Sequence, residues 1–110
     1  MKKQIICNKI DFWHVLSPQM VYRLIAENIV YQSDISNEKA GSVLQEEVTL
    51  TIAPEKVPEI LNQNLRYFLL TLYTAENQVF TVGTKTYPTA RLISTSVKGS
   101  QIKFTAKKPI

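Results

Sequence analysis

Residues 44–53, LQEEVTLTIA, carry the pattern that decides the fold class. Their large apolar side chains fall on one parity, at Leu44, Val48, Leu50 and Ile52. Because side chains of an extended chain alternate between two faces, this period of two predicts a strand that buries one face only. Glu46 is the exception on the apolar parity. We expect it at a β-bulge, or at an open sheet edge where its carboxylate reaches water.

Residues 66–74, RYFLLTLYT, are apolar on both parities, which predicts a central strand covered on both faces. The turn-forming residues 75–78, AENQ, follow, and residues 79–84 return as a third strand. Two strands joined by so short a turn are typical of an antiparallel hairpin.

Residues 89–97 and 101–106 predict a second hairpin, with the residues KGS between them as its turn. Turn residues near Asn77, Pro88 and Gly99 recur about every 11 residues, as in small antiparallel sandwiches and barrels. The predicted fold class is therefore mainly β: a small antiparallel β-sandwich or partly open barrel with one or two short helices.

Residues 54–65 interrupt the alternation of the strands. Their apolar side chains have helical spacing, at Val57, Ile60, Leu61 and Leu65. Glu55 and Glu59 lie in the first turn, where the helix dipole favours acidic groups, and Pro58 fits only near a helix start. The segment predicts a short helix or helical turn.

The chain of 110 residues is expected to form one β-rich domain, with residues 1–43 as an irregular N-terminal part and residues 107–110 as a basic tail. Twelve apolar residues of the predicted strands are expected in the core: Leu44, Val48, Leu50, Ile52, Phe68, Leu70, Leu72, Phe80, Val82, Leu92, Ile102 and Phe104.

The N-terminal part allows two interpretations. Ser17 and Pro18 suit the cap and first position of a helix, but β-forming residues follow them, so residues 18–28 fit either a helix or a strand. We favour a helical start near Pro18 that runs into a strand around residues 29–32. The polar residues 33–41 predict a mobile loop.

Charge is distributed unevenly along the chain, whose formal net charge is +4. Residues 1–55 hold five basic and seven acidic side chains, a balance of −2, whereas residues 56–110 hold eight basic and two acidic ones, a balance of +6. Such an asymmetry is expected either from two solvated surfaces of opposite sign or from a surface that binds an acidic protein, nucleic acid or a second copy.

The sequence lacks the residue patterns that most enzyme classes require. With one Cys and one His, the chain has no multi-Cys or multi-His metal set, and no phosphate-binding glycine loop or GxSxG sequence is present. Cys7 and His14 are a weak candidate for a nucleophile and its base, since no oxyanion-type glycine pair lies near Cys7. We expect no catalytic, metal or cofactor site.

No targeting or membrane segment is expected. The longest apolar run, at residues 67–70, is far shorter than the ~20 residues that span a bilayer. The N-terminus has no apolar stretch of the kind that a secretory signal requires. A cytoplasmic protein that does not contact a membrane is the expectation.

Residues 41–52 and 66–91 also share features with a known class of proteins. A glycine is followed by a polar–apolar alternation, then by a strongly apolar strand and a turn, and then by the residues VGT at 82–84 and PTARL at 88–92. This arrangement resembles small all-β structural proteins encoded in prophage-like regions of gut bacteria, of the tail or neck type. The resemblance implies a non-enzymatic, oligomeric protein, and it carries over no site residues.

The expected function is that of a structural or assembly protein that acts through protein–protein contacts, as a homo-oligomer or with a protein partner, in the cytoplasm or in a phage-like particle. We expect opposite charges to orient the subunits. The predicted contact residues are Arg91, Lys103, Lys107 and Lys108 against Glu38, Glu46 and Glu47. The alternative is a small β-barrel that binds nucleic acid through its basic C-terminal third.

Overall fold

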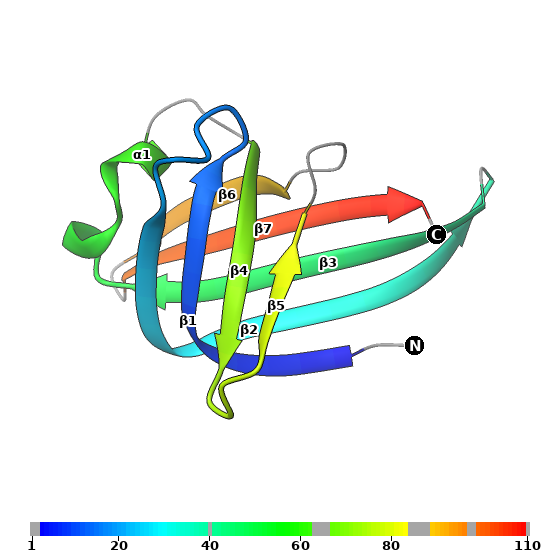
Figure 1. The fold of residues 1–110 in the computed structure, drawn as a ribbon, viewed down its shortest axis with the longest axis horizontal. Coiled ribbons are helices and arrows are strands. Elements are labelled where there is room, and N and C mark those ends of the chain that lie inside the picture. Colours follow the sequence, from blue (N-terminus) through cyan, green and yellow to red (C-terminus); the bar gives the residue numbers. More distant parts are fainter. Residues whose placement is uncertain (1–2, 40, 63–66, 84–88, 97–98, 110) are drawn as a thin grey trace.

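The computed structural model describes residues 3–39, 41–62, 67–83, 89–96 and 99–109. Seven strands form one sheet: β1 (Lys3–His14), β2 (Tyr22–Glu38), β3 (Gly41–Ile52), β4 (Tyr67–Thr74), β5 (Val79–Val82), β6 (Thr89–Ser96) and β7 (Gly99–Pro109). A 3-10 turn, η1 (Pro54–Lys56), and a short helix, α1 (Glu59–Asn62), lie between β3 and β4. The predicted mainly β fold class is confirmed, and the sheet is curled into a partly open barrel (Figure 1).

The strands follow the order β1-β2-β3-β7-β6-β4-β5, and a further antiparallel pairing of β1 with β4 closes the ring. One edge of β4 pairs with β1, while the other edge is shared between two strands. β6 pairs with β4 only at Tyr67 and Phe68, and β5 takes the part from Leu70 to Tyr73. The short contact with β6 leaves the barrel partly open on this side.

The barrel has a sharp corner at Asn8. The register of β1 shifts between Cys7 and Lys9 both toward β2 and toward β4. Three residues of β2, Ala26–Asn28, lie between the partners of Cys7 and Lys9, so β2 bulges as well. Bulges bend a strand and increase its twist. The first part of β1 accordingly follows β2, and its second part turns to run beside β4 (Figure 1).

The interior of the barrel is filled by aromatic rings. Phe12, Phe68 and Phe104 are fully buried, and their ring centroids lie 5.8 to 6.1 Å apart. Small barrels are generally filled in this way by side chains that point inward. This packing joins β1, β4 and β7, which are far apart in the sequence.

Most of the predicted core is confirmed. The buried members are Val48, Leu50, Phe68, Leu70, Leu72, Val82, Ile102 and Phe104. Ile52 and Phe80 are partly buried against this cluster, Leu44 lies outside it, and the side chain of Leu92 is outside the described part of the structure. The core residues that the sequence interpretation missed come mostly from β1 and β2: Cys7, Ile10, Phe12, Leu24, Ile29, Tyr31 and Ala106.

The prediction of an irregular, partly helical N-terminal part was wrong. Residues 1–43 contain β1 and most of β2, and the residues that suggested a helix cap form a turn instead. Ser17 donates its backbone N–H to the carbonyl of His14, and Met20 donates to the carbonyl of Ser17. The strand before this turn, β1, pairs both with β2 after the turn and with β4, and this tertiary pairing outweighs the local helical preference.

Two further segments predicted as loop or tail are strands. β2 continues to Glu38 and pairs with β3 as far as Gly41, so residues 33–38 belong to a long hairpin. β7 continues to Pro109, with Lys107 and Lys108 opposite Gln45 and Leu44. The polar sequences of these two segments did not indicate strands, because backbone hydrogen bonds of the ladder, and not buried side chains, hold the ends of β2 and β7 in the sheet.

The remaining elements agree with expectation except in two respects. Gly99 and Ser100, predicted in the turn of the second hairpin, belong to β7 and pair with β6. The β4–β5 hairpin is present, and its turn places Asn77 at a φ of 63°, a conformation that asparagine tolerates. Of the predicted helical segment 54–65, residues 54–56 form η1 and residues 59–62 form α1, and residues 63–65 lie outside the described part of the chain. β4, however, buries only the face with Phe68, Leu70 and Leu72, because its other face lies on the outside of the barrel.

Candidate functional site

Four exposed apolar side chains lie at one end of the barrel. Leu16 is 82% exposed, and Met20, Val21 and Tyr67 are each more than half exposed. The backbone N–H of Val15 donates to the carbonyl of Tyr67 over 3.1 Å, which fixes the β1–β2 turn beside the start of β4. No charged residue occurs in residues 15–22. We call Leu16, Met20, Val21 and Tyr67 the apolar end patch.

His14 supports this end of the barrel. It is buried, its ring makes an edge contact with Phe68 at 5.6 Å, and its Nδ1 accepts a hydrogen bond from the backbone N–H of Leu16. Cys7 lies near the middle of β1, seven residues before His14, which corresponds to about 20 Å of extended strand. Burial raises the pKa of the Cys7 thiol, which disfavours its reactive thiolate form. The structure therefore does not bring Cys7 and His14 together.

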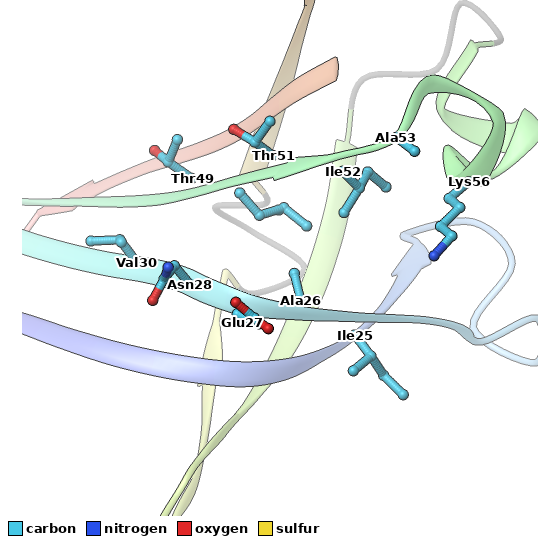
Figure 2. A pocket seen from close by; sticks show the side chains of 11 residues that line it. Ile25, Ala26, Glu27, Asn28, Val30, Thr49, Thr51, Ile52, Ala53 and Lys56 are labelled. Atoms are coloured by element: carbon cyan, nitrogen blue, oxygen red, sulfur yellow. The ribbon is translucent and has the colours of Figure 1, made fainter. Parts of the chain in front are cut away.

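A pocket of about 550 Å³ opens where β2 separates from β3 (Figure 2). The ladder between the two strands ends at Val30 and Thr49, and the next part of β3, Leu50–Ile52, pairs with β7 alone. The bulge in β2 opposite Asn8 explains the separation, because it turns the strand away from β3. We call this pocket the β2–β3 gap.

The walls of the β2–β3 gap combine apolar and charged groups. Ile52 and Lys56 extend from the β3 side toward β2, where Ile25, Ala26 and Glu27 lie (Figure 2). Ile25 is 73% exposed although it is a large aliphatic side chain. This wall chemistry suits an extended peptide better than a small polar metabolite.

A second hollow of about 480 Å³ lies on the other side of β2. Asn8, Lys9, Tyr73 and Asn77 contribute to its lining, together with Ile25. Ile25 lines both hollows. The corner of the barrel therefore presents two adjoining depressions with one exposed isoleucine between them.

A hydrogen-bonded cluster borders the second hollow on the outer face of β1, β2 and β4. The carboxylate of Asp11 accepts hydrogen bonds from Arg23 at 2.7 and 2.9 Å and from the hydroxyl of Tyr73 at 2.8 Å. The hydrogen bond from Arg23 is the main cause that lowers the pKa of Asp11. The Nζ of Lys9 lies 4.4 Å from the centroid of the Tyr73 ring. Arg23 balances the charge of Asp11, and we interpret the cluster as a clamp on the corner.

Glu46, one of the predicted contact residues, is not on the surface. It is buried, and its register in β3 is continuous toward both β2 and β7, so it lies neither at a bulge nor at an open edge as expected. The hydroxyl of Tyr31 donates to its carboxylate. Burial, followed by the interaction with Glu46, raises the pKa of Tyr31 to about 12. Glu46 thus has a structural partner inside the chain.

The other predicted contact residues are spread over four strands, β2, β3, β6 and β7. Lys103 lies 3.4 Å from a carboxylate oxygen of Glu47 on the neighbouring strand, so these two opposite charges meet within one chain. Lys107 is exposed and Lys108 half-buried at the end of β7. The side chains of Glu38 and Arg91 lie outside the described part of the structure.

The basic strand β7 offers no platform for stacking bases. Its aromatic residue, Phe104, is fully buried, and Lys103 interacts with Glu47. The residues of β7 that share a face with Lys103 are Gln101, Thr105, Lys107 and Pro109, none of which is aromatic. Single-stranded nucleic acid is usually held by aromatic rings beside basic groups, so β7 supplies only the charges.

Sequence interpretation missed the surface residues that stand out in the structure. Leu16, Met20 and Val21 lie in an uncharged run that includes the expected helix start, and Ile25 lies among the β-forming residues of the segment 18–28. The absence of charge over residues 15–22 was the one feature that could have identified the patch.

No protein-family model matches the chain, and comparisons with curated proteins and with solved structures gave no match either. Within the described ranges, no three His, Cys, Asp or Glu side chains are grouped as metal ligands would be. Over the same ranges, no helix has the length and apolar character needed to cross a membrane.

Proposed function

We propose that this chain is a non-enzymatic assembly protein that acts through protein–protein contacts between its own copies. The observation that carries the proposal is the apolar end patch, with four large side chains more than half exposed at one end of the barrel. Single exposed apolar residues are ordinary on a soluble protein, but a group of them is typical of an interaction site.

A second copy is the occupant that suits this patch. The patch residues and the turn that carries three of them are uncharged, so the surface can meet its own copy about a two-fold axis without repulsion. The resemblance to tail and neck proteins makes a phage-like particle the assembly in which we propose to look first, with the free protein in the cytoplasm.

Light scattering on a sizing column, at two protein concentrations and at low and high salt, tests the proposal. We expect a discrete multimer that persists at high salt, because burial of apolar surface is not screened by ions. A particle of 12.5 kDa under all conditions would exclude self-assembly.

The Leu16→Lys variant tests the surface itself. Leu16 is almost fully exposed, so a lysine there leaves the core intact and places a charge within the contact. Ile35→Lys is the matched control, since Ile35 is also an exposed aliphatic residue but lies in the distant β2–β3 hairpin. We expect only Leu16→Lys to yield monomers.

A multimer that loosens with salt would instead favour the opposite-charge contact. In that case Lys107→Glu together with Lys108→Glu should weaken assembly, and Leu16→Lys should leave it unchanged. The two sets of variants therefore separate an apolar contact from an electrostatic one.

A further inference from the structure

We infer that the β2–β3 gap binds an extended peptide segment of a partner protein, with an aliphatic side chain against Ile25 and a carboxylate beside Lys56. The inference rests on the proposed role in protein–protein contacts, and it names a second contact, distinct from the apolar end patch. Its basis is the coincidence of an incomplete strand ladder, an exposed isoleucine and two lysines, Lys56 and Lys9, at one corner of the barrel.

The incomplete ladder between β2 and β3 favours a bound peptide whose main chain is extended. Beyond Thr49, β3 continues to Ile52 with β7 on one side and the gap on the other. A strand edge of this kind presents backbone donors and acceptors to which an added strand can pair. The gap has the width to admit a chain because the bulge at Ala26–Asn28 carries β2 away from β3.

The apolar lining of the β2–β3 gap favours a bound peptide with an aliphatic side chain. Ile25 is 73% exposed, and Ile52 and Ala53 line the same gap (Figure 2). In an extended segment every second side chain points to the same face, so one aliphatic residue of the partner can cover Ile25 while its neighbours face away. Covering Ile25 removes an exposed aliphatic surface from water.

The charges around Ile25 favour an acidic segment. Lys56 reaches into the gap from the β3 side (Figure 2). Lys9 lines the second hollow, which Ile25 also lines. Among the residues that the structure describes, Glu27 is the one acidic residue that lines either hollow. A carboxylate on the partner, next to the residue that covers Ile25, therefore meets the lysines that line the two hollows.

The test is a titration of the full chain, labelled with ¹⁵N, with two capped synthetic peptides followed by NMR. Both peptides alternate Thr and Val, and they differ in one central residue, Glu in the first and Lys in the second. We expect amide shifts near Ile25 and Ile52, and binding of the Glu peptide about tenfold tighter than that of the Lys peptide.

Variants make the test decisive. Ile25→Arg should abolish binding, whereas Ile35→Arg, an exposed isoleucine of the same strand outside both hollows, should leave it intact. Lys56→Glu should reverse the preference toward the Lys peptide. No saturable binding, equal losses in the two isoleucine variants, or an unchanged preference in Lys56→Glu would overturn the inference.

The outcome is separable from that of the proposed self-assembly. A multimer that dissociates with Leu16→Lys, combined with failure of the peptides to bind, would remove the β2–β3 gap as a site and leave the apolar end patch. Peptide binding by a protein that stays monomeric would support the gap and exclude assembly between copies.

Discussion

The hydroxyl of Tyr31 donates a hydrogen bond of 2.5 Å to Glu46 across the β2–β3 ladder, where the two residues are only 7% and 8% exposed. In the register of these strands Ser33 stands opposite Glu46 and Val48 stands opposite Tyr31, so Tyr31 and Glu46 are diagonal neighbours. A buried carboxylate requires hydrogen-bond donors, so this diagonal pair explains how an acidic residue occupies the apolar face of β3.

Replacing Tyr31 with Phe is expected to destabilise the fold by about 1–3 kcal/mol, because the buried carboxylate of Glu46 loses its donor while the ring is kept. Urea unfolding measures the change. Tyr22→Phe is the control, since Tyr22 is also partly buried and its ring stacks on Phe12. An equal effect of the two substitutions would show that the hydroxyl of Tyr31 contributes nothing specific.

The same pair predicts a loss of stability in alkali. The pKa of Tyr31 is raised from 10.0 to about 12, so the folded state holds the phenolic proton more tightly than the unfolded state. The resulting stabilisation is fully present below pH 10 and is lost as the pH rises toward 12. Tyr31→Phe should flatten this part of the pH profile. The substitution leaves Tyr73, whose hydroxyl donates to the carboxylate of Asp11, unchanged.

The Asp11 clamp predicts a loss of stability in acid. Hydrogen bonds from Arg23 and Tyr73 lower the pKa of Asp11 below 3.8, so the stabilisation is present above that pH and is lost as the pH falls below it. Asp11→Asn should therefore be less stable than the original chain at neutral pH and approach it in acid. The difference should be small, because Arg23 is more than half exposed.

The measurement is a double-mutant cycle of the original chain, Asp11→Asn, Arg23→Gln and the variant with both substitutions. The free energy of unfolding of each protein is measured from neutral pH into acid. A coupling close to zero at neutral pH would show that the clamp does not stabilise the corner.

Gly99→Ala is expected to cost more than Gly41→Ala. Both glycines have a positive φ, 135° and 119°, so alanine is strained at either position. At Gly99 an added Cβ would also lie 2.8 Å from the carbonyl oxygen of Ile52, whereas at Gly41 it would meet no atom within 4 Å. We expect a loss of about 1 kcal/mol at Gly41 and roughly 2–3 kcal/mol at Gly99 in thermal or urea unfolding. Equal losses would show that β3 moves freely away from β7 at this point.

The strands that could be predicted are those with local patterns. The alternation in residues 44–52 and the turn at Asn77 identify β3 and the β4–β5 hairpin without knowledge of their neighbours. β1 and β2 could not be found in this way, because Ser17 and Pro18 suit a helix start equally well. Their strand character becomes clear only once β1 pairs with β4.

The contacts of the charged residues could not be predicted either, because they too depend on which strands pair. Periodicity fixes the face on which Glu46 and Glu47 lie, but only the register shows that Tyr31 and Lys103 are their partners. The exposure of Ile25 depends on a bulge opposite Asn8, which no pattern in the sequence marks.

The β1–β4 pairing has a consequence for how the chain reaches this structure. Tyr73 and Asp11, which bond across that pairing, are separated by 62 residues, so the ring closes through one of the most distant contacts of the chain. Loop closure over such a distance is slow, which places the sealing of the barrel late in folding. During synthesis on the ribosome, β1, β2 and β3 emerge before β4 exists. Until then the edge of β1 is uncovered, and the nascent chain is exposed to aggregation through that edge.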